Sequence, residues 1–373
     1  MKKMNRNIEA FFALLRAGIW EQNVQLSGYE PIDFNEVYRL AEEQSVVGLI
    51  AAGLEHVTDS KIPKEVVLQF VGQTLQLEQR NIAMNKLIRD LIIDLRKADV
   101  YTLLVKGQGV AQCYERPLWR ASGDIDFYMS EENFLKAREF FRTKVDAFYP
   151  DNDNARRIEM NYGQWVVELH ANQRITLSER ANRVLDEIHR DLFYGGNVRS
   201  WLNDSTSVFL PSPNNDVLIV FTHYLNHFYK GGIGLRQICD WCRLLYTFND
   251  KIDRRLLENR IRKMGFVREW RAFAMFAVTE LGMPTHAMPM YKDSKRLKRK
   301  AKKIKSFILE VGNFGHNRNL DYYGKYPYLI RKFISMKIRT TDLLRHARIF
   351  PIDTLRFFPN IMFNGLRSAF KGE

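Results

Sequence analysis

The spacing of apolar residues changes twice along this chain, and these changes limit the folds it can adopt. Residues 8–90 repeat apolar side chains at intervals of three and four, as amphipathic helices do. Between about residues 95 and 200 the apolar residues alternate or form short β-rich runs, as strands require. Helical spacing returns from residue 214. We therefore expect an α/β (α+β) protein with a small mixed sheet flanked by N- and C-terminal helical regions.

The expected strands lie at residues 100–105, 124–129, 157–162 and 164–170. A turn at Gly163 would join the last two as a β-hairpin. Helical patterns cover residues 66–97, 107–114, 131–143, 216–228, 235–248 and 254–281. The expected regions are N-terminal helices (1–95), an α/β core (96–205), a helical region that completes a cleft (206–290) and a basic, aromatic-rich helical tail (291–373).

The positive charge of the chain is concentrated near its C-terminus. The formal net charge is +14, and residues 291–373 hold 20 Lys and Arg against 6 Asp and Glu, so the remainder is neutral. Such a region favours an anionic partner, either a membrane surface or a nucleic acid. A solvated helix face explains the same charges. The apolar residues between Phe357 and Phe370 could lie on a membrane or pack against the protein body.

Nothing in the sequence indicates export or membrane insertion. The basic start of the chain is not followed by a continuous apolar run or a small-residue cleavage site. No stretch approaches the roughly 20 apolar residues of a spanning helix. Three cysteines do not make a disulfide framework in a chain of 373 residues. We expect a soluble, cytoplasmic protein.

Asp124 and Asp126 are the residues most indicative of chemistry. Residues i and i+2 of a strand share a face, so the two carboxylates would lie side by side, with Ile125 and Phe127 turned into the core. A divalent cation that prefers oxygen ligands, such as Mg²⁺ or Mn²⁺, would relieve their repulsion. Gly123 would allow a ligand to approach the backbone closely. The alternative is a pair of solvated aspartates at a strand edge.

Two other segments strengthen the metal-site interpretation. Lys106-Gly107 stands where a strand is expected to end and a helix to begin, a junction whose N–H groups and dipole favour phosphate. Glu168 is the one acidic residue among apolar neighbours on a later strand, so its side chain is expected to face a site. His170 shares the face of Glu168.

This order of segments resembles the polymerase-beta-type nucleotidyltransferase superfamily, in which a Gly-containing turn precedes D-x-[D/E] and a third acidic residue on a neighbouring strand. More narrowly, over roughly residues 35–250, the chain resembles a bacterial family of uncharacterised nucleotidyltransferases. The residues that carry the narrower resemblance are Lys106-Gly107, Arg120, GDIDFYM at 123–129, ELH at 168–170, His223, His227, GLRQICDW at 234–241 and LAEEQSVVGLI at 40–50.

The resemblance implies transfer of a nucleotidyl group from a nucleoside triphosphate, such as ATP, to a hydroxyl acceptor of unknown identity. Asp124, Asp126 and Glu168 would bind two divalent ions, Mg²⁺ or Mn²⁺, and Glu168 would help to deprotonate the acceptor. The residues expected to bind the nucleotide are Lys106, Gly107, Arg120 and Gly123. Further candidate cleft residues are His170, His223, His227, Arg236 and Asp240.

Three of these positions have alternative interpretations. The turn Gly107-Gln108-Gly109 lacks the serine that the superfamily uses to contact phosphate, so a catalytically idle member that binds a nucleotide or a partner is the second hypothesis. The four-residue spacing of His223 and His227 suits zinc but lacks the glutamate of the metalloprotease motif, so we expect histidines packed near the nucleotide. Arg236 and Asp240 could form a helix-surface ion pair instead of lining the cleft.

Overall fold

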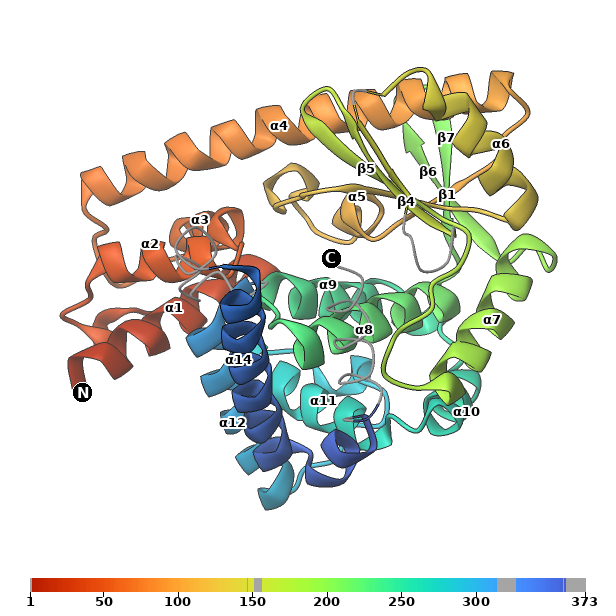
Figure 1. Ribbon diagram of the computed structural model, residues 1–373. Coiled ribbons are helices and arrows are strands. Elements are labelled where there is room, and N and C mark those ends of the chain that lie inside the picture. The colour runs from red at the N-terminus through yellow and green to blue at the C-terminus, as the bar shows by residue number, and fades with distance from the viewer. Residues whose placement is uncertain (1, 146, 151–155, 314–326, 358, 360–373) are drawn as a thin grey trace.

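A mixed five-stranded sheet lies between two groups of helices in the computed structural model, which describes residues 2–145, 147–150, 156–313, 327–357 and 359 (Figure 1). Its strands are β1 (Leu103–Val105), β2 (Ile125–Tyr128), β3 (Ala147–Pro150), β4 (Arg157–Tyr162) and β5 (Trp165–His170), in the order β1-β2-β5-β4-β3. β2 and β5 are parallel, and the other neighbours are antiparallel. The expected α+β fold with a small mixed sheet is confirmed.

The register of this sheet brings acidic residues together. Asp126 on β2 is the partner of Glu168 on the parallel strand β5. Glu168 is in turn opposite Glu159 on the antiparallel strand β4, because the tight turn at Gly163 pairs Tyr162 with Trp165. One face of the sheet therefore carries three carboxylates on three adjacent strands.

The strands differ from the expected ones in length and number. The run at residues 100–105 contributes only the three residues of β1. Neither β3 nor the hairpin of β6 (Val198–Asn203) and β7 (Thr206–Pro211), which packs beside β1, was predicted. All residues of β2 are buried, so the alternative of a solvated strand edge does not hold for Asp126. Helices cover both faces of this strand.

On one face of the sheet, Ile125 and Phe127 pack in a core built with α4 (Lys64–Lys97) and α6 (Glu131–Arg142). On the other face, Tyr128 joins a second core that includes α7 (Glu179–Phe193) and α8 (Pro213–Lys230). Asp126 lies on this second face, so it points toward the helices that follow the sheet in the sequence.

The N-terminal helices are α1 (Lys2–Trp20), α2 (Phe34–Glu43) and α3 (Val47–Glu55). α4 begins directly after Pro63, and its 34 residues run from above these helices to the sheet (Figure 1). α5 (Gly107–Ala111) is much shorter than the predicted helix 107–114. The remaining helices are α9 (Leu235–Thr247), α10 (Arg254–Met264), α11 (Val267–Leu281), α12 (Lys295–Val311) and α14 (Tyr328–Ile349).

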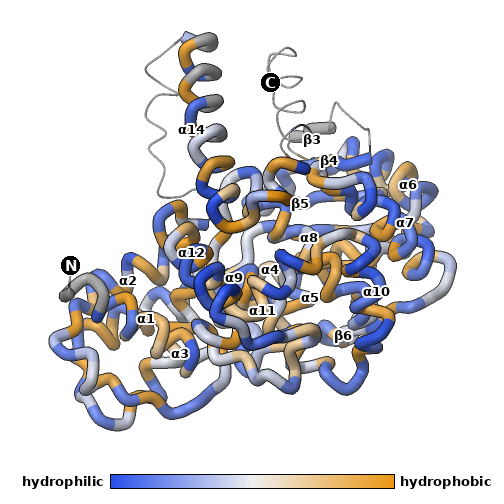
Figure 2. Tube along the Cα trace, turned by 90° about the horizontal axis from the view of Figure 1, so that it is seen from below, coloured by the Kyte–Doolittle hydropathy of each residue, from blue (hydrophilic) through white to orange (hydrophobic). Residues whose placement is uncertain are grey.

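The basic region begins as an ordered helix. The run KRLKRKAKKIK forms the first part of α12, which buries Ala301 and Ile304 against the body. α14 extends beyond the other helices (Figure 2). Phe357 is buried and its ring lies 5.2 Å from that of Tyr229, which fits the packing interpretation, whereas Phe358 and residues 361–370 lie outside the described residues. None of the described helices is both long enough and apolar enough to span a membrane.

Candidate functional site

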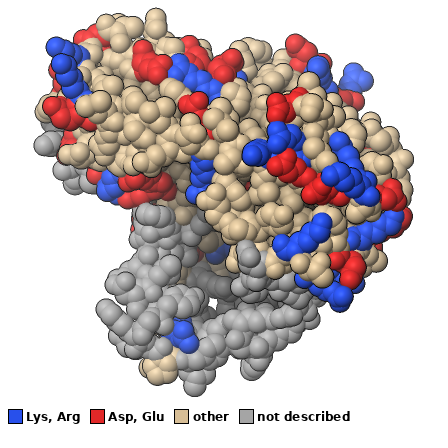
Figure 3. Space-filling view, turned by 90° about the horizontal axis from the view of Figure 1, so that it is seen from above, with Lys and Arg blue, Asp and Glu red and all other residues tan. Residues whose placement is uncertain are grey.

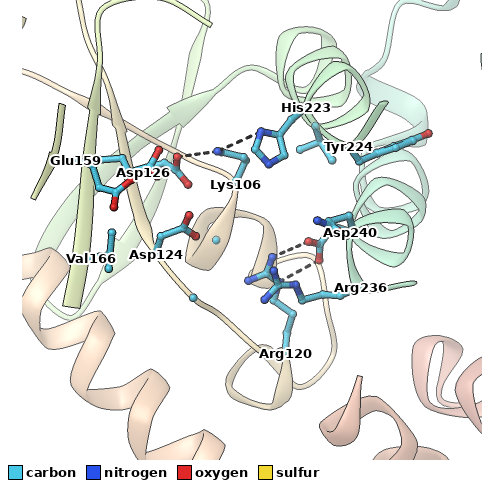
Figure 4. A pocket seen from close by; sticks show the side chains of 15 residues that line it. Lys106, Arg120, Asp124, Asp126, Glu159, Val166, His223, Tyr224, Arg236 and Asp240 are labelled. Carbon is cyan, nitrogen blue, oxygen red and sulfur yellow. Dashed lines mark hydrogen bonds and ion pairs between the residues drawn. The ribbon is translucent and has the colours of Figure 1, made fainter. Parts of the chain in front are cut away.

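A cavity of about 410 Å³ lies between the acidic face of the sheet and helices α8 and α9 (Figure 4). It is lined by ten of the twelve residues predicted for the site: Lys106, Gly107, Arg120, Gly123, Asp124, Asp126, Glu168, His223, Arg236 and Asp240. His170 lies behind the carboxylates, and His227 lies one turn beyond His223 on α8; neither lines the cavity.

Five further residues complete the lining: Glu159, Val166, Val220, Tyr224 and Gln237. The sequence prediction missed them all. A signal for Glu159 was present, because the predicted hairpin around Gly163 places residue 159 opposite Glu168. The others are apolar or amide side chains of α8, α9 and β5 that no local pattern distinguishes from core residues.

A chain of charged contacts crosses the acidic wall of the cavity, which is formed by Asp124, Asp126 and Glu168. Lys106 donates from Nζ to Oδ1 of Asp126 at 2.7 Å. The same carboxylate oxygen lies 2.9 Å from Nε2 of His170, which is also 3.1 Å from Oε2 of Glu168. Arg157 on β4 completes the chain by donating to both oxygens of Glu168, at 2.8 and 3.2 Å. Asp126 and Glu168 are thus held by cationic neighbours.

The electrostatic effect of these neighbours differs among the carboxylates. Burial favours the neutral form of Asp126, but Lys106 and His170 outweigh it and hold the pKa of this carboxyl below its usual range. Burial likewise opposes ionisation of Glu168, and hydrogen bonds from His170 and Arg157 lower its pKa overall. Burial also disfavours charged His170, yet its two carboxylate partners raise its pKa.

Asp124 is compensated only in part, because the charges of Lys106 and Arg236 lower its pKa without outweighing the effects that raise it. It makes no hydrogen bond or ion pair with any residue in the described part of the chain. The negative charge of Asp126, reinforced by burial, raises the pKa of Asp124. Asp124 therefore lacks the positive partner that Asp126 has in Lys106.

The donor set of this wall fits a hard divalent cation. Asp126, Glu168 and His170 each offer a ligand atom, and these atoms lie within 4.8 Å of one another. Asp124 adds a third carboxylate whose charge is not balanced. Carboxylate oxygens are the ligands that Mg²⁺ and Mn²⁺ prefer. Within the described residues no other group of this kind occurs, and His223 and His227 are not part of it.

The opposite wall contains a buried ion pair between two predicted cleft residues. Arg120 donates from Nε and Nη2 to the two carboxylate oxygens of Asp240, at 3.0 and 2.6 Å. Tyr114 also donates to Asp240, at 2.9 Å, and Arg120 donates to Ser122. The alternative of a helix-surface pair between Arg236 and Asp240 is therefore wrong, because Asp240 faces inward and bonds the loop before β2.

Arg236 is the cation of this wall that lacks a carboxylate partner among the described residues. Its Nη1 donates to the carbonyl of Ala121 at 2.9 Å, while its buried Nε has no hydrogen-bond partner. Burial, together with the positive charge of Arg120, lowers the pKa of Arg236. An anion in the cavity would reverse both effects.

The two histidines of α8 are neutral groups beside Lys106. Their ring centroids lie 4.5 Å apart, and Nδ1 of His223 is 3.5 Å from Nζ of Lys106. Burial and the charge of Lys106 hold the pKa of His223 well below its usual value and lower that of His227 to about 4. The neutral ring of His223 can therefore accept a hydrogen bond from Lys106 at Nδ1.

The turn after β1 has an unusual geometry. Lys106 has φ of +57°, a conformation that costs a side-chain-bearing residue free energy, and Gly107 follows with φ of +40°. Gln108 turns away from the cavity: its buried side chain donates to Oδ1 of Asn81 on α4 at 2.8 Å. Asn81 in turn donates to the carbonyls of Leu118 and Arg120, so Gln108 supports the loop instead of contacting a ligand.

Comparison with known families gives one match. The model of a family described as "Uncharacterised nucleotidyltransferase" matches residues 30–281. The chain belongs to this family. The match includes every residue of the cavity and most of the helices around it. Membership in the uncharacterised nucleotidyltransferase family and the buried acidic cluster together support a role in nucleotidyl transfer. Neither the curated proteins nor the solved structures gave a match.

Proposed function

We propose that this chain catalyses metal-dependent transfer of a nucleotidyl group from a nucleoside triphosphate, such as ATP, to a hydroxyl group of an acceptor. The observation that carries the proposal is the placement of Asp124, Asp126 and Glu168 along one wall of a cavity whose other wall bears Arg236. A triphosphate needs both walls, because its charge must be neutralised while its α-phosphorus is attacked.

Asp124, Asp126 and Glu168 are proposed to hold Mg²⁺ or Mn²⁺. Bound there, the ions would lower the pKa of the attacking hydroxyl and stabilise the negative charge of the leaving pyrophosphate. His170 positions two of these ligands, since its Nε2 lies near oxygens of both Asp126 and Glu168. Lys106 neutralises Asp126 before the nucleotide arrives.

The reaction forms a bond from the acceptor oxygen to the α-phosphorus and breaks the bond from that phosphorus to the β-phosphate, which leaves as pyrophosphate. The hydroxyl proton passes to Glu168. Arg157 must first move from Glu168, because the hydrogen bonds from His170 and Arg157 keep this carboxylate a weak base.

The phosphates are proposed to contact Arg236 and Lys106. Arg236 has donors that no described carboxylate uses, and Lys106 can leave Asp126 for a phosphate oxygen. Gly107 and Gly123 leave room for backbone contacts; a Cβ at Gly123 would meet no atom within 4 Å. Arg120 is proposed to act indirectly, by holding Asp240 and the loop beside Arg236.

The proposed function is tested by measuring pyrophosphate release from each NTP with Mg²⁺ or Mn²⁺ over a panel of hydroxyl acceptors. We expect metal-dependent release by the wild type and by the control Asp250→Asn, which changes an exposed aspartate far along the sequence. Asp126→Asn should abolish it. Release that persists in Asp126→Asn would overturn the proposal.

The second candidate is a catalytically idle member that binds a nucleotide or a partner. Two observations favour it: Gln108 replaces the phosphate-contacting serine and faces α4, and both Asp126 and Glu168 are already paired with cations. Calorimetric titration with Mg²⁺ and a non-hydrolysable NTP separates the two. Tight binding without turnover on any acceptor supports the idle member.

The basic C-terminal region is proposed to contact an anionic partner, either a membrane surface or a nucleic acid. Two lysines of α12 are paired within the chain, Lys298 with Asp293 and Lys305 with Glu280. The exposed cations that remain include Arg296, Arg299 and Lys302. Replacing these three by glutamine should weaken salt-dependent binding to RNA or to anionic vesicles, whichever is the partner, and leave folding intact.

A further inference from the structure

The N-terminal half of α4 exposes a regular apolar stripe that none of the described residues covers. Val67, Leu68, Val71, Leu75 and Ile82 are 41%, 71%, 46%, 54% and 45% exposed. The C-terminal half of the same helix, by contrast, buries its apolar side chains under the sheet. From above, the surface that α4 crosses includes a wide area without charged side chains (Figure 3).

The spacing of this stripe is that of a coiled-coil seam. Leu68, Leu75 and Ile82 recur every seven residues, and Val71 lies three residues after Leu68 and four before Leu75, whereas Glu78 takes the corresponding place in the next heptad. Singly exposed apolar residues are ordinary on a protein surface, but a contiguous stripe at heptad spacing is typical of a helix that packs against another helix.

Gly72 lies beside Val71 on the exposed side of α4. A Cβ at this position would meet no atom within 4 Å, and the helix continues through it without a break. Glycine weakens an exposed helix relative to alanine. It does permit the close approach of a second helix, which a Cβ would prevent.

We propose that α4 forms a symmetric dimer by packing antiparallel against α4 of a second copy of this chain. The charges of the stripe favour this occupant. Lys64 and Glu78 flank the part of the stripe from Val67 to Leu75, so an antiparallel arrangement that crosses at Val71 and Gly72 brings each Lys64 alongside Glu78 of the other copy, while Ile82 lies beyond the crossing region. The same arrangement sets Leu68 against Leu75.

The remaining neighbours do not oppose self-association. After Glu65, the exposed polar residues that precede Glu78 are Gln69, Gln73 and Gln76, so the middle of the two identical surfaces carries no like charges. Glu78 accepts a hydrogen bond from Trp119 with Oε2 at 3.3 Å, which leaves its other oxygen for the lysine. This dimer does not rest on the proposed catalytic function, because α4 contributes no residue to the cavity lining.

Disulfide trapping of the full chain tests the dimer and its direction. The native cysteines, Cys113, Cys239 and Cys242, are buried, so the wild type should not cross-link under mild oxidation. Val71→Cys should give a covalent dimer, because residue 71 lies next to the two-fold axis. Gln69→Cys, exposed on another side of the same helix, should remain monomeric on denaturing gels.

Sedimentation velocity at micromolar concentration supplies the second measurement. The wild type should sediment as a dimer, and Leu68→Glu with Leu75→Glu should raise the dissociation constant at least about tenfold without changing the circular dichroism spectrum. Lys64→Glu alone and Glu78→Lys alone should weaken the dimer, and the double exchange should restore it. A monomeric wild type, or equal cross-linking of the two cysteine variants, would overturn the proposal.

Discussion

Lys106 and Asp126 form a nearly buried ion pair of 2.7 Å at the centre of the acidic wall. Lys106 reaches it from a backbone conformation with positive φ, so the fold accepts local strain to place this ammonium group there. The pair neutralises one of two neighbouring aspartates and leaves Asp124 unbalanced. The wall is thus arranged to receive one more positive charge.

The ion pair should be strongly coupled in a double-mutant cycle. Lys106→Met is expected to lower the free energy of unfolding by about 3 kcal/mol, because it leaves Asp126 charged and buried. Adding Asp126→Asn should recover most of that loss, a coupling of more than about 1 kcal/mol. Urea denaturation measures both values. Additive losses would show that the two side chains do not act as a pair.

Asp124→Asn should stabilise the metal-free protein near neutral pH. The raised pKa of Asp124 means that its ionised form is disfavoured in the folded state, so removing the charge removes a penalty. We expect the melting temperature to rise by about 2 °C, the shift that a change below 1 kcal/mol produces in a large domain.

The same substitution should also remove the stabilisation of the wild type by Mg²⁺ or Mn²⁺, measured by thermal melting with and without the ion. Asp250→Asn is the matched control and should follow the wild type. A variant that Mg²⁺ stabilises as much as the wild type would exclude Asp124 from the metal site.

Substitutions should show that Arg120 stabilises the fold and that Arg236 binds the ligand. Arg120→Ala is expected to destabilise the fold by about 3–5 kcal/mol, because it leaves Asp240 charged and buried without its bidentate partner. Chemical denaturation measures this loss. Arg120→Lys should recover only part of it, since lysine cannot bond both oxygens in the same way.

Arg236→Gln is expected to weaken binding of Mg²⁺–NTP about 10- to 100-fold, the contribution of a charge-assisted hydrogen bond, with little loss of stability. Isothermal titration calorimetry measures the affinity. If the Arg236→Gln protein binds the nucleotide as tightly as the wild type, Arg236 does not contact the phosphates.

Glu269, buried on α11 outside the cavity, should make stability depend on pH. Burial and the charge of Asp353 raise its pKa from 4.5 to about 8. The folded state therefore binds more protons than the unfolded state between these values, and stability falls as pH rises through this window.

Glu269→Gln should then match the wild type near pH 4 and exceed it by a few kcal/mol near about pH 9, by urea denaturation. Glu65→Gln, at an exposed position of α4, is the control and should show the same pH profile as the wild type. Parallel profiles for Glu269→Gln and wild type would show that Glu269 does not titrate in this range.

The acidic wall could be predicted because its determinants are local. Period-two spacing puts Asp124 and Asp126 on one face, and a single acidic residue in an apolar strand marks Glu168. The adjacency of β2 and β5, however, came from the family resemblance, since no periodicity specifies which strands pair. The predicted hairpin at Gly163 also places Glu159 opposite Glu168, so Glu159 could have been predicted as a residue of the site.

The opposite wall could not be predicted from local patterns. The four-residue spacing of Arg236 and Asp240 indicates a helix pair, yet Asp240 bonds Arg120, which lies 120 residues earlier. Similarly, Gln108 appeared as a missing phosphate contact, whereas it bonds Asn81 of α4, the helix that precedes β1. Such contacts depend on tertiary packing, which overrides helix-surface preferences worth only a few tenths of a kcal/mol.

The distribution of the two walls along the chain has a consequence for biosynthesis. Every carboxylate of the acidic wall leaves the ribosome before α8 and α9, which carry His223, Arg236 and Asp240. A nascent chain that has reached only β5 holds Lys106, Arg157 and His170 as internal counter-charges, while Arg120 still lacks Asp240. The ability to bind a triphosphate should therefore arise late in translation, when α9 emerges and closes the second wall.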